Sequence, residues 1–189
     1  MQKCPHIVLT GLMGCGKSSV GRCLAHHSGW LFSDIDSMVE AYSRRTINEI
    51  FAEEGEAAFR ELETQMLDLA LKDSKAGVIA TGGGAVLSKI NRDLMKKSGF
   101  VVYLQAEPDV LCERTSKDQT RPLLRHEDRL GTLTRLLQER EKFYLEADLI
   151  LGIRQRNVRI LSREIWENYR KTYPDSVIDG ASDQLGYWE

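Results

Sequence analysis

Short apolar runs separated by long amphipathic stretches give this chain its pattern. Four runs rich in β-branched or aromatic residues lie at positions 7–9, 78–80, 100–104 and 149–151, with a weaker one at 30–32. Runs of this kind are typical of strands buried on both faces of a sheet. Because strands that alternate with helices are joined by right-handed crossovers, the pattern predicts an α/β fold with a parallel sheet.

The stretches between the runs carry helix signals. Thr46 and Glu49 have the spacing of a capping box, which predicts a helix over 47–54 that stops at Gly55. From residue 56 onward, apolar residues recur at spacings of three and four: Phe59, Leu62, Met66 and Leu69. This spacing predicts one buried helical stripe. Further helices are expected at Pro108, which fits a first turn, over about 127–147 and over about 157–173.

Composition limits the classes of protein to consider. The chain has 189 residues, 42% of them hydrophobic, which suits one domain over residues 1–173, followed by a polar extension over 174–189 that we expect to be mobile. No apolar stretch approaches the ~20 residues of a membrane span or forms a signal peptide. The four cysteines show neither CxxC nor zinc spacing. We therefore expect a cytoplasmic monomer with free thiols.

Charge is balanced overall but not locally. The 26 Lys and Arg nearly cancel the 28 Asp and Glu, for a net charge of -2, which disfavours binding to nucleic acid or to an anionic membrane. Ten of the 16 arginines, however, lie between Arg114 and Arg163. The second half of the chain can therefore carry a local site for an anion.

A phosphate-binding loop follows the first predicted strand. Residues 11–18 read GLMGCGKS and fit G-x-x-x-x-G-K-[ST] at every fixed position, between a strand and a helix. In such a loop the backbone N–H groups surround nucleotide phosphates, Lys17 contacts the β- and γ-phosphates, and Ser18 binds Mg²⁺. The expected ATP contacts in this segment are Gly14, Cys15, Gly16, Lys17, Ser18 and Ser19. The alternative is a glycine-rich turn with a chance lysine.

Two polar motifs follow later strands. Asp34 and Asp36 are two residues apart, so in an extended segment their side chains would point the same way, one toward Mg²⁺ and the other toward an acceptor hydroxyl. Alternatively, Asp36 only caps a helix over 38–42. The glycines at 82–84 follow the strand at 78–80, at the carboxyl end where α/β sheets place ligands. They favour binding of a polar ligand over a plain turn.

Arginines supply the remaining candidates. Arg140 lies at helical spacing among apolar residues: Leu130, Leu133, Leu137 and Tyr144. A buried guanidinium must be paired or face a cavity, and it fits a carboxylate well; an intramolecular ion pair is the alternative. Arg60 lies at the edge of its own stripe and could reach the same pocket. The polar segment 113–125 resembles a lid whose Arg121 could neutralise a transferring phosphoryl group, although a solvated loop is equally consistent.

Over residues 6–165 the sequence resembles the shikimate kinases, a family of small P-loop phosphotransferases. The resemblance is carried by GLMGCGKS, SDID, FAEEGEAAFRELE, TGGGAV, TRPLL and EREKFY, in that order. It implies a P-loop NTPase-like three-layer sandwich with a five-stranded parallel sheet of order 2-3-1-4-5. It also implies the reaction of ATP and shikimate to ADP and shikimate 3-phosphate, a step of chorismate and aromatic amino-acid biosynthesis, with Mg²⁺ as cofactor.

The resemblance also implies roles for individual residues. Asp34 would assist at Mg²⁺ together with Ser18, while Asp36 would bind shikimate hydroxyls and is the proposed base. Helices within about 36–73 would bind the acceptor. The carboxylate of shikimate would be held by Arg60 and Arg140, and its ring by Gly82, Gly83 and Gly84. Arg114 and Arg156 fall where the family holds adenine, and Arg121 falls in the lid.

Two alternatives remain at this point. A kinase for gluconate or another small metabolite shares the phosphate loop and can also need arginines for a carboxylate. A catalytically silent nucleotide-binding module would need the loop alone. Lys17, Asp36 and Arg121, the expected catalytic residues, favour an enzyme.

Overall fold

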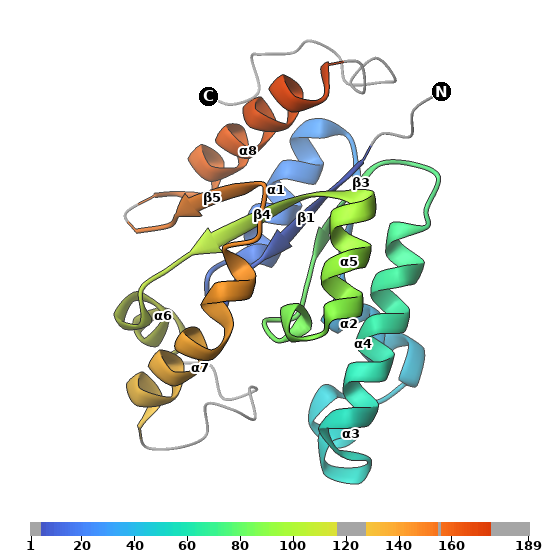
Figure 1. Cartoon of the computed structure of the whole chain (residues 1–189), viewed down its shortest axis with the longest axis vertical. Coiled ribbons are helices and arrows are strands. Elements are labelled where there is room, and N and C mark those ends of the chain that lie inside the picture. The colour runs from blue at the N-terminus through green and yellow to red at the C-terminus, as the bar shows by residue number, and fades with distance from the viewer. Residues whose placement is uncertain (1–4, 117–127, 155, 175–189) are drawn as a thin grey trace.

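A five-stranded parallel sheet forms the centre of the molecule. The computed structural model describes residues 5–116, 128–154 and 156–174 (Figure 1). The strands are β1 (His6–Thr10), β2 (Leu31–Asp34), β3 (Gly77–Ala80), β4 (Gly99–Gln105) and β5 (Leu149–Gly152). Their order is β2-β3-β1-β4-β5, which confirms the predicted α/β class and the strand order implied by the family resemblance.

The centre and the edges of the sheet differ in burial. β1 pairs with β3 on one side and β4 on the other, with Val8 opposite Ile79 and Val101. These strands are buried, as predicted. The edge strands β2 and β5 are not buried on both faces: Leu31 is 65% exposed and Ile150 is 41% exposed. The prediction of full burial was wrong there because an edge strand has a neighbour on one side only.

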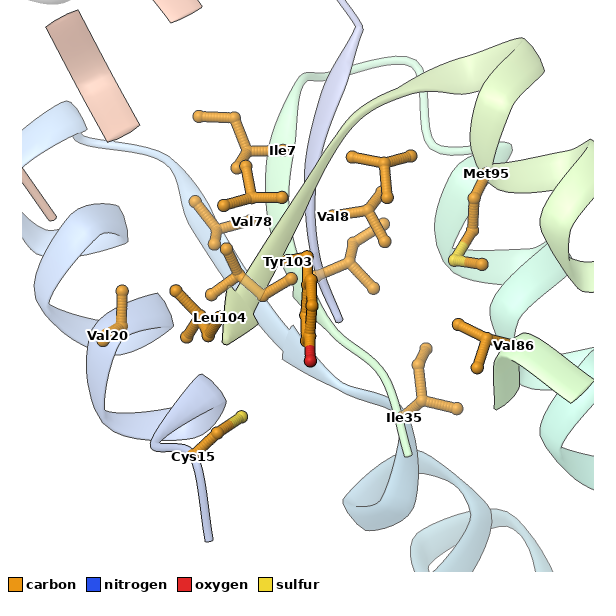
Figure 2. Packing of buried hydrophobic residues seen from close by; sticks show 14 of the residues in the cluster. Ile7, Val8, Cys15, Val20, Ile35, Val78, Val86, Met95, Tyr103 and Leu104 are labelled. Atoms are coloured by element: carbon orange, nitrogen blue, oxygen red, sulfur yellow. The ribbon is translucent and has the colours of Figure 1, made fainter. Parts of the chain in front are cut away.

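Helices cover both faces of the sheet. They are α1 (Lys17–Ser28), α2 (Ile35–Ser43), α3 (Ile47–Glu53), α4 (Gly55–Leu71), α5 (Lys89–Ser98), α6 (Pro108–Thr115), α7 (Arg129–Tyr144) and α8 (Val158–Thr172), with a 3-10 turn η1 (Ala85–Leu87). α1 packs on α8, and α4 packs on α5. Figure 2 shows Val20 of α1 and Met95 of α5 on opposite sides of the sheet residues Val8 and Tyr103. The arrangement is a three-layer sandwich.

Local sequence signals predicted some helix ends correctly. The capping box is present: Glu49 N donates to Thr46 Oγ1 at 3.2 Å, and Thr46 N donates to Glu49 Oε2 at 2.7 Å. Gly55 has a φ of 83°, which breaks the chain direction between α3 and α4. α8 begins after Asn157, whose side chain accepts from Ile160 N at 2.9 Å.

Other predictions about the helices need correction. α7 is shorter than the predicted 127–147. Leu69 and Leu130 were placed on buried stripes, but they are 58% and 48% exposed. Leu67, two residues before Leu69, and Leu133, three residues after Leu130, are buried instead. α5 was not predicted. Its start is capped by Ser88, which accepts from Asn91 N at 3.4 Å. In the described part of the chain, no helix is both long and apolar enough to span a membrane.

Candidate active site

The loop between β1 and α1 has the geometry of an anion site. Gly11, Gly14 and Gly16 have φ angles of 135°, 83° and 96°, a region that residues with a side chain rarely adopt. The loop leads into the N-terminus of α1, where free N–H groups and the helix dipole favour a phosphate. Lys17 Nζ lies over the loop and donates to Gly11 O at 2.7 Å and to Leu12 O at 3.2 Å.

The side chains within this loop face different ways. Cys15 is 1% exposed and points into the core beside α1 (Figure 2), so only its backbone is available to a ligand. Ser19 is exposed on α1. Met13 lines the neighbouring cavity described below.

A hydroxyl and a carboxylate meet at the start of α1. Ser18 Oγ donates to Asp34 Oδ2 at 2.6 Å, which joins the phosphate loop to the end of β2. The other carboxylate oxygen, Oδ1, accepts from Ser37 N at 3.4 Å and caps α2. Oxygen ligands of this kind suit Mg²⁺, so this pair fits the metal site expected from the sequence.

The expected geometry of the two aspartates was wrong, although both lie at the site. Asp34 ends β2, while Asp36 lies in the first turn of α2, so the segment is not extended across both residues. The alternative that Asp36 caps the helix is also wrong, because Asp34 takes that position. The change from strand to helix turns Asp34 toward Ser18 and Asp36 toward a separate cavity.

This cavity has a volume of about 480 Å³ and lies beside the phosphate loop at the carboxyl ends of the central strands. Its lining includes Met13, Asp36, Phe51, Arg60, Glu63 and the glycines Gly82, Gly83 and Gly84. The residues come from the loop, from α2, α3 and α4, and from the turn after β3. The predicted acceptor residues Asp36, Arg60 and the three glycines are therefore brought together.

Two of the three glycines leave room for charged side chains. A Cβ at Gly82 would overlap Glu63 Oε1 and lie 2.8 Å from Asp36 Oδ1. A Cβ at Gly84 would lie 2.6 Å from Cζ of Arg60, closer than packed atoms allow. The turn can approach these groups only because it has no side chains of its own.

Arg60 is held by two carboxylates of its own helix. Its Nη1 lies 2.8 Å from Glu63 Oε2, and its Nη2 lies 2.8 Å from Glu56 Oε1. Glu63 is fully buried; burial raises the pKa of Glu63, although the guanidinium of Arg60 opposes the shift. The sequence interpretation missed Glu63. The signal was available, since Glu63 lies at helical spacing between Phe59 and Met66, on a buried stripe.

Arg140 is buried as predicted, at 4% exposure, on the stripe that also holds Leu133 and Tyr144. Its Nη1 donates to Gly83 O at 3.1 Å, so it lies behind the glycine turn and contacts a residue of the cavity wall. Among the described residues, Arg140 forms no ion pair, in contrast to Arg60 and Arg92. The Nε of Arg140 also has no hydrogen-bond partner there. The intramolecular ion pair is thus not formed there.

Arg114 and Arg156 do not line this cavity. Arg114 lies in the last turn of α6, beside the phosphate loop, with Nη1 3.8 Å from where a Cβ of Gly16 would be. Arg156 is exposed and pairs with Glu164 at 2.7 Å. Arg121 lies outside the described residues. The proposed lid over 113–125 needs correction at its start, because residues 113–115 form the last turn of α6; 117–125 are not described, nor is the extension beyond residue 174.

A parallel sheet with a phosphate loop at the end of β1, and a second, charged cavity beside that loop, defines the class of P-loop kinases. The sequence model of the family described as shikimate kinase matches residues 13–170. This chain belongs to the shikimate kinase family, and it is a kinase that acts on an alcohol group.

Individual relatives agree with this assignment. Shikimate kinase of Geobacter metallireducens is 42% identical over 161 residues, which cover 85% of this chain and 89% of the relative. Shikimate kinase from Acinetobacter baumannii in complex with shikimate has a TM-score of 0.86 at 39% identity, covering 89% of this chain and 94% of that one. A gluconokinase from Sinorhizobium meliloti, with a TM-score of 0.57 and 19% identity over 91% of this chain and 95% of that one, shares the fold.

Proposed function

We propose that this chain transfers the γ-phosphoryl group of ATP to the 3-hydroxyl of shikimate, which gives shikimate 3-phosphate and ADP within chorismate biosynthesis. The observation that carries the proposal is the cavity beside the phosphate loop. It combines a carboxylate for a hydroxyl, Asp36, with a guanidinium for a carboxylate, Arg60. Shikimate has the matching hydroxyl and carboxylate groups on one small ring.

The nucleotide side of the reaction is assigned to the loop and to α1. Backbone N–H groups of residues 14–19 bind the phosphates, and Lys17 moves from the carbonyls that it now contacts to the β- and γ-phosphates. Ser18 and Asp34 hold Mg²⁺, which supplies charge neutralisation when bound. Arg114 lies near enough to Gly16 to contact the nucleotide. Arg156 stays a sequence-based assignment to adenine, and Arg121 to the transferring phosphoryl group.

The acceptor side is assigned to the cavity. Asp36 accepts a hydrogen bond from the reacting hydroxyl and orients it, or takes its proton, while Arg60 and Arg140 bind the substrate carboxylate. Glu63 keeps the Arg60 guanidinium in place through the 2.8 Å ion pair. Gly82, Gly83 and Gly84 form the wall against which the ring lies. Phosphoryl transfer then depends mainly on positioning and electrostatics.

The proposal is tested by ADP release with shikimate, gluconate and nucleoside monophosphates as acceptors, each with ATP and Mg²⁺. We expect turnover with shikimate and little with the others. Gluconate is the informative competitor because it also has a carboxylate and hydroxyls, but on a flexible chain. Turnover that is faster with gluconate, or ATP binding without any acceptor turnover, would overturn the assignment in favour of the other kinase or of a silent nucleotide-binding module.

The methyl ester of shikimate gives a second, sharper comparison. It keeps the ring and the three hydroxyls but removes the charge that the arginines would bind. We expect the ester to raise KM strongly with a smaller effect on kcat, because the reacting hydroxyl is unchanged. Equal KM values for acid and ester would contradict carboxylate binding by Arg60 and Arg140.

A further inference from the structure

One backbone carbonyl in the glycine turn, residues 82–84, accepts hydrogen bonds from two side chains of the same helix. Gly83 O accepts from Tyr144 Oη at 2.5 Å and from Arg140 Nη1 at 3.1 Å. The two donors are one turn apart on α7, and both side chains are buried. The turn that forms a wall of the cavity is thus tied to α7 by a single, shared acceptor.

Stacking and burial hold the Tyr144 side chain in this position. Its ring stacks on that of Tyr103 of β4, with centroids 4.8 Å apart and planes 17° apart. Burial raises the pKa of Tyr144 well above the ordinary value for tyrosine, so its hydroxyl remains a proton donor throughout the neutral range. By contrast, the Tyr103 hydroxyl is buried without a hydrogen-bond partner among the described residues.

The Gly83 peptide also lies against the phosphate loop. A Cβ on Gly83 would lie 3.2 Å from Met13 N and 3.6 Å from Gly11 O, so the backbones of the two loops lie close together here. Since C=O and N–H of a trans peptide point in opposite directions, holding Gly83 O toward α7 also fixes the direction of the following N–H. The same carbonyl positions Arg140, whose guanidinium has no carboxylate partner in the described ranges.

We propose that Tyr144 is a positioning residue for the acceptor: its hydroxyl fixes the Gly83 carbonyl, and through it the glycine turn and the Arg140 guanidinium. The proposal rests on the proposed function, because it assigns Tyr144 to binding of the shikimate carboxylate and ring rather than to the nucleotide. Without this hydroxyl, Arg140 is the only side chain described here that holds the carbonyl, and both the peptide and the guanidinium gain freedom.

The test compares two variants of one stacked pair. Tyr144→Phe removes the hydroxyl that donates to Gly83 O, and Tyr103→Phe removes the hydroxyl that makes no hydrogen bond. Both keep the rings and the stacking. We expect Tyr144→Phe to raise KM and Kd for shikimate by about three- to tenfold, the range for one buried hydrogen bond. KM for ATP should stay within about twofold of the wild-type value. Tyr103→Phe should leave all of these constants unchanged.

Thermal melting of both variants separates positioning from a general loss of stability. The proposal holds if only Tyr144→Phe weakens shikimate binding and if this effect exceeds that on ATP. It is overturned if Tyr144→Phe binds shikimate like the wild type, if KM for ATP rises by the same factor, or if Tyr103→Phe has the same effect. A wild-type enzyme that does not phosphorylate shikimate would overturn the proposed function as well, whereas an active wild type with an unaffected Tyr144→Phe variant would overturn the role of Tyr144 alone.

Discussion

Replacement of Arg140 by methionine should separate substrate binding from stability. Arg140 is buried, donates to Gly83 O and forms no ion pair within 4 Å among the described residues. Methionine fills a similar volume without the charge. Each charge-assisted hydrogen bond to a substrate carboxylate contributes about 1.5–3 kcal/mol, so Arg140→Met should raise KM for shikimate by about tenfold to 150-fold. KM for ATP should change little.

Thermal melting of the same variant gives an independent measure of shikimate binding. At a shikimate concentration 100 times the wild-type Kd, the ligand stabilises the wild type by about 2.7 kcal/mol, and with 30-fold weaker binding this falls to about 0.9 kcal/mol. For a domain of this size the shifts in Tm are about 5–11 °C and about 2–4 °C. Without ligand, Arg140→Met should melt at or above the wild-type temperature, because a buried charge without an ionic partner costs stability.

Arg135→Met is the matched control. Arg135 lies on the exposed side of α7, so this change removes the same charge from the same helix without reaching the glycine turn. It should leave the shift in Tm caused by shikimate unchanged. The reasoning is refuted if shikimate stabilises Arg140→Met as much as the wild type, or if Arg140→Met weakens ATP and shikimate equally.

The remaining predictions concern the two aspartates and the capping box. Asp36→Asn should lower kcat by about 10²- to 10⁴-fold while ATP binding measured by calorimetry persists; near-normal turnover would exclude a role as base or orienter. Asp34→Asn keeps a side chain that caps α2 equally well, so Tm should equal that of the wild type. The Mg²⁺ concentration for half-maximal rate should rise about 10- to 100-fold. A fall in Tm with unchanged Mg²⁺ dependence would indicate a capping role only. Hydrogen bonds from Thr46 lower the pKa of Glu49 from 4.5, so in urea unfolding the wild type should exceed Glu49→Gln in stability above about pH 4.5, and the difference should vanish as pH falls through the lowered pKa. A difference independent of pH would contradict this account.

The sequence predicted the central strands and the phosphate loop because each depends on local pattern. Apolar runs mark the buried strands, and the glycine and lysine spacing marks the loop. The strand order came from the family resemblance, since periodicity does not say which strands are neighbours. α5 was missed because its sequence, KINRDLMKKS, is mostly polar and shows little of its buried face.

The site was predicted less evenly. Arg140 was found because a charge among apolar positions stands out, and the same rule would have found Glu63. The relation between Asp34 and Asp36 was misjudged because the two-residue period of a strand holds only while both residues are in the strand. Here the helix begins at Ile35, and the change of backbone conformation sends the two carboxylates to different places. Such a change is decided by capping and packing together, which spacing alone does not show.

The glycine turn takes on a second meaning in the structure. From the sequence, three glycines suggested a backbone that a ligand approaches closely. The structure shows that the protein's own charges already approach these positions: Glu63 and Asp36 lie close to Gly82, and Arg60 lies close to Gly84. An alanine at either position would therefore displace a charged side chain before it met any ligand. The requirement for glycine thus arises partly from the Arg60–Glu63 pair, which must lie against the turn if the guanidinium is to stay in the cavity wall.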